Sequence, residues 1–68
     1  MKNLIKMERA RINLTQADLA DKVNVSRQTI NSIEIGKYVP SSVLAFKIAF
    51  VFNKKVDEIF MLEETDWK

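Results

Sequence analysis

Five residues of types that end helices constrain the fold of this chain more than any other feature, because they divide it into segments of helical length. Asparagine and glycine tolerate the left-handed backbone conformation that ends helices, and proline cannot continue a helix. The five helix-ending residues are Asn13, Asn24, Gly36, Pro40 and Asn53. Only one Gly and one Pro occur in 68 residues, so the intervening segments have few other interruptions. The pattern predicts an all-α protein of short helices joined by short loops.

Capping residues place five helices between these breaks. Thr15, with Asp18 three residues later, is close to a capping box, and Ser26 is a second N-cap. We expect helices from an Asn3 cap to about residue 11 or 12, over 16–23, over 26–35, from a Ser41 or Ser42 cap to about 52, and over about 56–60. Residues 60–62 are also compatible with an extended segment that pairs with the N-terminal segment. The expected fold is a compact five-helix single domain over residues 1–68.

The composition argues against catalytic and metal-dependent functions. The chain has no Cys and no His, so it lacks thiolates, the commonest general base and the commonest metal ligand. We therefore expect no enzyme, no metal site and no cofactor. No apolar run approaches the roughly 20 residues of a membrane span, and charges interrupt the N-terminal residues that a signal peptide would keep apolar. These features predict a cytoplasmic protein without a membrane partner.

Charge is distributed unevenly along the chain. Residues 1–55 contain ten Lys and Arg against four Asp and Glu, a net charge of +6. Residues 56–68 contain one Lys against five Asp and Glu, a net charge of −4. The positive net charge of residues 1–55 favours a polyanionic partner. Random scatter of charge over a small surface is the simpler alternative, and charge alone does not decide between them.

The third expected helix carries the most informative surface. At about 100° per residue, Ile30 and Ile33 fall on one side, and the opposite side has no carboxylate. That opposite side presents Arg27, Gln28, Asn31 and Ser32. Arg suits the two acceptors of guanine, and Gln or Asn suits adenine, at base edges in the major groove. An ordinary solvated face usually mixes Glu with Lys, so we predict that this side reads double-stranded DNA.

A second helix, a turn and this third helix form a helix-turn-helix candidate over about residues 16–35, with Ala20 small enough for close packing and Asn24 suited to the turn. The relevant motifs are Leu14-Thr15-Gln16, Leu19-Ala20, Val25-Ser26-Arg27-Gln28-Thr29-Ile30, Ile33-Glu34-x-Gly36-Lys37, Pro40-Ser41, Leu44-Ala45-x-Lys47-Ile48-Ala49 and Asp57-Glu58-Ile59-Phe60. In these motifs the chain resembles the lambda-repressor-like (Cro/repressor type, or XRE) helix-turn-helix family, over about residues 4–60. By size it is similar to the compact stand-alone repressors of that family. The resemblance implies a DNA-binding transcriptional regulator.

The resemblance also implies roles for individual residues. Base-reading positions are matched by Arg27, Gln28 and Ser32, with Asn31 as a further candidate. Phosphate contacts are implied or expected for Gln16, Ser26, Thr29, Lys37, Tyr38 and Ser41. The resemblance also implies that Gln16 buttresses the recognition helix. Arg9 and Glu34 match a structural ion pair that links the first and third helices and orients the recognition helix.

The fourth expected helix is apolar on nearly all sides, which favours either a central position or an interface with another copy. We expect a dimerisation segment over about residues 43–68, with candidates Val43, Phe50, Ile59, Phe60, Met61, Leu62 and Trp67; burial in the core is the alternative for each. A two-fold dimer would set two recognition helices about 34 Å apart, matching a palindromic site. The leading prediction is a homodimeric repressor on a palindromic operator. The alternatives are an antitoxin-type autoregulator that also binds a protein partner, and a helical interaction module that binds no DNA.

Overall fold

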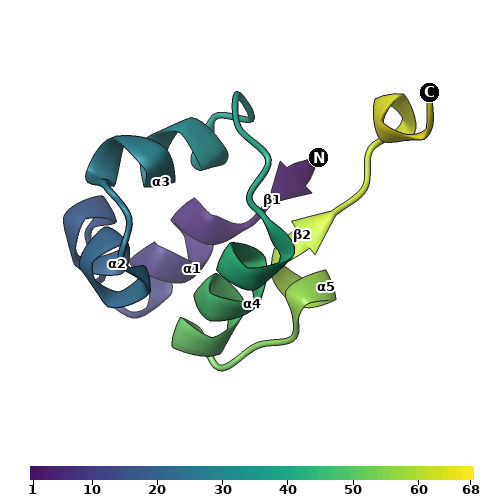
Figure 1. Cartoon of the computed structure of the whole chain (residues 1–68). Helices are drawn as coiled ribbons and strands as arrows, with labels where there is room; N and C mark the ends of the chain where they lie inside the picture. Colours follow the sequence, from purple (N-terminus) through teal and green to yellow (C-terminus); the bar gives the residue numbers. More distant parts are fainter.

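The computed structural model describes all 68 residues and contains five α-helices with a small two-stranded sheet (Figure 1). In chain order the elements are β1 (Lys2–Asn3), α1 (Ile5–Arg11), α2 (Gln16–Val23), α3 (Arg27–Glu34), α4 (Ser42–Val51), α5 (Val56–Ile59), β2 (Phe60–Met61) and a 3₁₀ helix, η1 (Glu64–Trp67). The predicted five-helix fold is confirmed. None of the helices combines the length and the apolar character that crossing a membrane requires.

The asparagines and the glycine end helices as the sequence predicts. Asn13, Asn24 and Asn53 have φ values of 55°, 61° and 55°, and Gly36 has a φ of 81°. These are left-handed conformations, which Asn and Gly adopt at lower cost than other residues. The turn between α2 and α3 therefore depends on Asn24, which adopts the left-handed conformation that the turn requires.

Hydroxyl side chains start three of the helices. Thr15, Ser26 and Ser41 accept hydrogen bonds from the main-chain N–H groups of Asp18, Thr29 and Leu44, respectively. At α2 the Asp18 carboxylate also accepts from the Thr15 N–H, which completes a capping box. The hydrogen bonds from Thr15 lower the pKa of Asp18 below its ordinary value.

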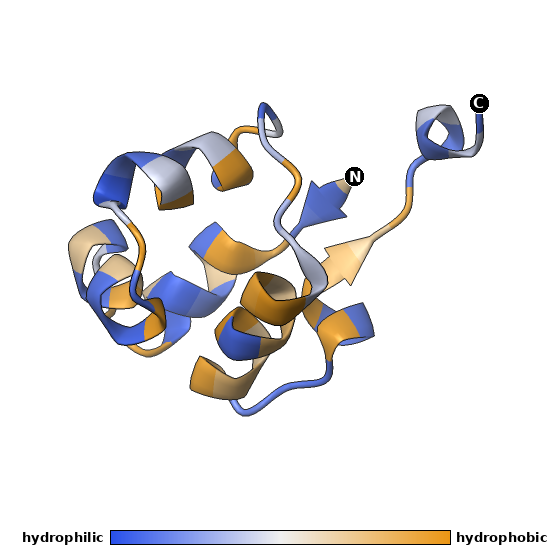
Figure 2. Cartoon of the chain, in the orientation of Figure 1, coloured by the Kyte–Doolittle hydropathy of each residue, from blue (hydrophilic) through white to orange (hydrophobic).

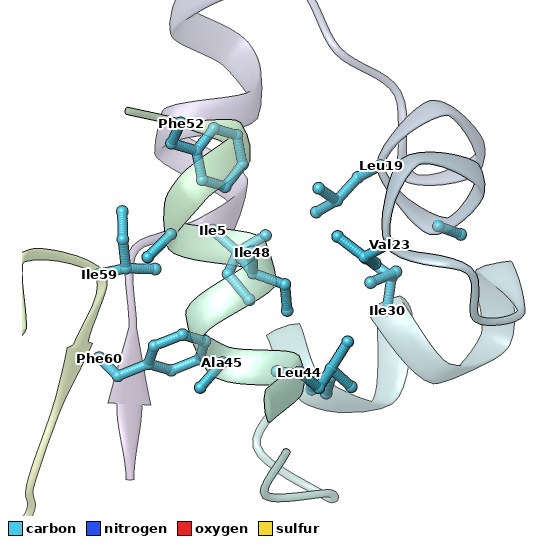
Figure 3. Packing of buried hydrophobic residues seen from close by; sticks show 13 residues of the cluster. Ile5, Leu19, Val23, Ile30, Leu44, Ala45, Ile48, Phe52, Ile59 and Phe60 are labelled. Atoms are coloured by element: carbon cyan, nitrogen blue, oxygen red, sulfur yellow. The ribbon is translucent and has the colours of Figure 1, made fainter. Parts of the chain in front are cut away.

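The hydrophobic core lies between α4 and the other helices. Thirteen buried apolar residues form one cluster, and Figure 3 shows Leu19, Val23 and Ile30 directed toward Ile48 of α4. Ile30 has no exposed surface, and Ile33 has 1%. Because fully burying one such side chain is worth roughly 1.5–3 kcal/mol, these two residues fix the inner side of α3 against the body.

The two short strands bring the ends of the helical body together. β1 and β2 are antiparallel, with Lys2 opposite Met61 and Asn3 opposite Phe60. The predicted pairing of an extended segment near residue 60 with the N-terminal segment is thus confirmed. α1 begins at Ile5 after Leu4, one residue later than a cap at Asn3 predicts. Asn3 instead accepts from the Ile5 N–H and donates its Nδ2 to the carbonyl of Ile33, 2.9 Å away.

Candidate nucleic-acid interface

The structure brings the four expected base-reading residues together on the outer side of α3. Arg27, Gln28 and Asn31 are exposed and Ser32 is half-buried, while Ile30 lies beneath them in the core. We call these four residues the α3 polar face. In Figure 2 the ribbon of α3 is mostly blue to white, whereas that of α4 is mostly orange. A shallow hollow lined by Gln16, Arg27, Gln28 and Asn31 shows that the start of α2 adjoins this face.

An ion pair between Arg9 and Glu34 joins α1 to the end of α3. Arg9 Nε lies 2.7 Å from Glu34 Oε2, and Arg9 Nη2 lies 3.1 Å from Glu34 Oε1. A further guanidinium nitrogen donates to the carbonyl of Leu14 at 3.0 Å. The hydrogen bond to Glu34 raises the pKa of Arg9 above its ordinary value. The side chains are 14% and 6% exposed, so the pair is largely shielded from water.

Gln16 connects this ion pair to the α3 polar face. Its Nε2 donates to Glu34 Oε1 at 3.2 Å and to Asn31 Oδ1 at 3.1 Å. Both amide hydrogens therefore have partners inside the protein. The phosphate contact expected of Gln16 stays a prediction, and through the side chain it would require one of these two hydrogen bonds to be exchanged for one to phosphate. Its main-chain N–H remains a candidate, because it lies in the first turn of α2, where N–H groups have no partner within the helix.

The other expected phosphate contacts lie around the two ends of α3. Ser26 and Thr29 are hydrogen-bonded to each other through their hydroxyls, 2.9 Å apart, and Ser41 accepts from the Leu44 N–H, so all three hydroxyls already have a structural role. Lys37 and Tyr38 are exposed in the loop after α3. The main-chain N–H groups of both donate to the carbonyl of Ser32, at 2.9 and 3.2 Å. A second hollow beside the α3 polar face is lined by Ser26, Gln28, Thr29, Ser32 and Tyr38.

The side of α4 away from the core is an uncovered apolar surface. Val43 and Phe46 are each 65% exposed, and Phe50 is 85% exposed. We call these three residues the α4 apolar surface. These residues line a shallow hollow between α2 and α4, and Lys22 and Lys47 also line it. Phe46 was not among the expected interface residues, although its spacing of three and four residues from Val43 and Phe50 places all three on one side of a helix.

The expected dimerisation residues at the C-terminal end fall into two groups. Leu62 and Trp67 are 60% and 77% exposed, and Met61 is half-buried. Ile59 and Phe60 are 0% and 6% exposed, so their assignment to a dimer interface was wrong. Both belong to the hydrophobic core, because the β1–β2 pairing holds this part of the chain against the helical body.

Comparison with known proteins identifies the group to which this arrangement belongs. The sequence profile of the helix-turn-helix family matches residues 5–59. An uncharacterized HTH-type transcriptional regulator of Methanocaldococcus jannaschii is 58% identical over 66 residues, which are 97% of this chain and 100% of that protein. One from Archaeoglobus fulgidus is 50% identical over 97% of this chain and 93% of its own length. One from Bacillus subtilis is 48% identical over 94% of this chain and 97% of its own length.

The shielded ion pair generates a stability prediction. Arg9→Met leaves the Glu34 carboxylate without its cation and should cost about 3 kcal/mol in the free energy of unfolding. The double variant Arg9→Met/Glu34→Met removes both charges and should cost less than Arg9→Met alone. Urea denaturation of the wild type, both single variants and the double variant measures this difference. A double variant whose loss equals the sum of the two single losses would show that the charges do not interact.

Proposed function

This chain belongs to the helix-turn-helix family, and from that membership and its surface we propose that it is a sequence-specific DNA-binding transcriptional regulator. The regulators that it resembles match it over nearly their whole lengths, so the comparison extends across the entire DNA-binding unit. In the proposed mode of action, α3 enters the major groove and its polar face contacts base edges. We further propose that the chain acts as a repressor, by occupying an operator.

The observation that carries this proposal is the α3 polar face and the absence of a free carboxylate from it. The one acidic residue of α3, Glu34, is turned away into its ion pair with Arg9. Arg27 and Gln28 are exposed and have no side-chain hydrogen bond within the chain, so both are free to contact bases. Arg is suited to guanine and Gln to adenine in the major groove. A helix turned to solvent with no other role would not need to sequester its only negative charge.

Phosphate contacts around this face would set the register on the duplex. Lys37 supplies a cation next to the end of α3, and Tyr38 adds an exposed hydroxyl. The main-chain N–H groups at the start of α2 and the Ser41 region provide neutral donors. Contacts of this kind position a protein without selecting a sequence. Binding should therefore weaken as salt rises, because each neutralised phosphate releases counterions.

We propose that the regulator is a homodimer in which the α4 apolar surface, together with Met61, Leu62 and Trp67, contacts a second copy. Phe46 and Phe50 are exposed, and aromatic residues are enriched at protein–protein interfaces. A closed two-fold dimer uses the same surface on both copies. Two α3 helices about 34 Å apart would then read a palindromic operator with one half-site each. One helix reads only a few base pairs, so the second copy extends the recognised sequence.

The separation of base-reading from phosphate contacts is testable by substitution. Arg27→Ala or Gln28→Ala should relax discrimination at one position in each half-site by about 1–3 kcal/mol. Lys37→Ala serves as the matched control and should weaken binding to all sequences alike. Selection of bound duplexes from a random DNA pool measures both effects for each variant. A loss of preference at one base position for Lys37→Ala would overturn the assignment of its role, and an unchanged preference for both α3 variants would overturn theirs.

The α4 apolar surface generates a prediction about assembly. Phe50→Gln should weaken self-association about thirtyfold, the effect expected for a central aromatic contact worth about 2 kcal/mol. Met7→Gln is the control, because Met7 is also exposed but lies on α1. Sedimentation equilibrium of the wild type and both variants gives the dissociation constants. A wild-type chain that is monomeric at tens of micromolar would contradict the homodimer and favour the antitoxin-type alternative, in which this surface binds a different protein.

A further inference from the structure

We propose that the Arg9–Glu34 ion pair, acting through Gln16, sets the direction of the Asn31 side-chain amide, and that Asn31 therefore selects guanine. The inference rests on the proposed function, since it concerns which base the α3 polar face accepts. Gln16 acts here as a positioning residue and Asn31 as the residue that touches the base.

The two hydrogen bonds from Arg9 fix which atoms donate and which accept at Glu34. Arg9 has only hydrogen-bond donors and an ionised Glu34 has only acceptors, so the direction of their two hydrogen bonds cannot reverse. Oε1 of Glu34 accepts from Arg9 Nη2 and also faces the Gln16 amide, 3.2 Å away. A carboxylate repels a carbonyl oxygen at this distance. Gln16 must therefore direct its Nε2 group, and not its Oε1 atom, toward Glu34.

Gln16 in turn sets the direction of the Asn31 amide. The Nε2 group of Gln16 carries two hydrogens, of which one is used by Glu34. The other points to Asn31 Oδ1, 3.1 Å away. The opposite orientation of Asn31 would bring two NH₂ groups into contact. Asn31 therefore keeps its oxygen on the Gln16 side and presents its Nδ2 donors at the exposed surface of α3.

An NH₂ group directed outward recognises a base that offers acceptors in the major groove. Guanine offers two acceptors in the major groove, N7 and O6, whereas adenine offers one acceptor and one donor. A bidentate contact with adenine needs the Asn oxygen and the Nδ2 group to face the base together, whereas here the oxygen is directed at Gln16 and keeps only one lone pair. Arg27 lies beside Asn31 in the hollow that Gln16 and Gln28 also line, and its side chain likewise has donors only. Gln28 has no internal hydrogen bond and remains free to turn either way, so it is the residue suited to adenine.

The experiment combines sequence selection from random duplex DNA with substitutions at two positions. Asn31→Ala should flatten the preference at one position per half-site, which identifies the base that Asn31 contacts. The wild type should prefer guanine there by roughly tenfold over adenine. An adenine preference at that position, or no position affected by Asn31→Ala, would overturn the inference while leaving sequence-specific binding intact. Failure of the wild type to enrich any sequence would instead contradict the proposed function.

Variants at Gln16 test the relay itself. Gln16→Glu replaces the donor by an acceptor, so Asn31 should turn its Nδ2 inward and its oxygen outward. The preferred base should then change from guanine to one with an exposed donor, cytosine or adenine. Gln16→Met keeps the length but removes both hydrogens and adds no charge beside Glu34, and it should reduce the guanine preference to within about twofold of adenine. Thermal melting checks that both variants fold. A guanine preference that survives in Gln16→Met shows that the relay does not direct Asn31.

Discussion

The ion pair between Arg9 and Glu34 is the interaction on which the arrangement of the polar surface depends. Two parallel N–H···O bonds join α1 to the end of α3, and a two-point contact fixes rotation as well as position. Ile30 holds the opposite side of α3 in the core. With both constraints in place, α3 has one orientation, in which its carboxylate is turned inward and its other polar side chains outward. The same carboxylate holds Gln16, so the first turn of α2 is tied to α3.

Much of the fold was predictable from the sequence, because its determinants are local. Thr15 and Ser26 cap the helices that follow them, and the left-handed Asn24 ends α2 at the residue that the pattern indicated. Amphipathic spacing likewise identified which side of α3 is buried. The Arg9–Glu34 pair spans 25 residues and was reached only through the family resemblance, since no local pattern brings α1 and α3 together.

The remaining features depend on how distant segments meet. Phe60 was expected at an interface, but it is buried. The reason is that β2 pairs with β1, which lies near the opposite end of the sequence. The resemblance implied that Gln16 supports the recognition helix, but the hydrogen bond from Gln16 to Asn31 depends on the angle between α2 and α3, so the sequence did not indicate which side chain Gln16 contacts. The apolar composition of α4 did not reveal which side is covered. In the structure one side faces the core, and Phe46 and Phe50 lie on the uncovered side.

The central claim is that the outer side of α3 contacts base edges in DNA. Its most direct test is an NMR titration of the ¹⁵N-labelled protein with the duplex obtained by selection, following the backbone and side-chain amide signals. The largest shifts should occur at the side-chain amides of Gln28 and Asn31 and at the start of α2, with smaller ones in the loop after α3. Shifts concentrated on α4 and η1, with the α3 amides unchanged, would contradict the account.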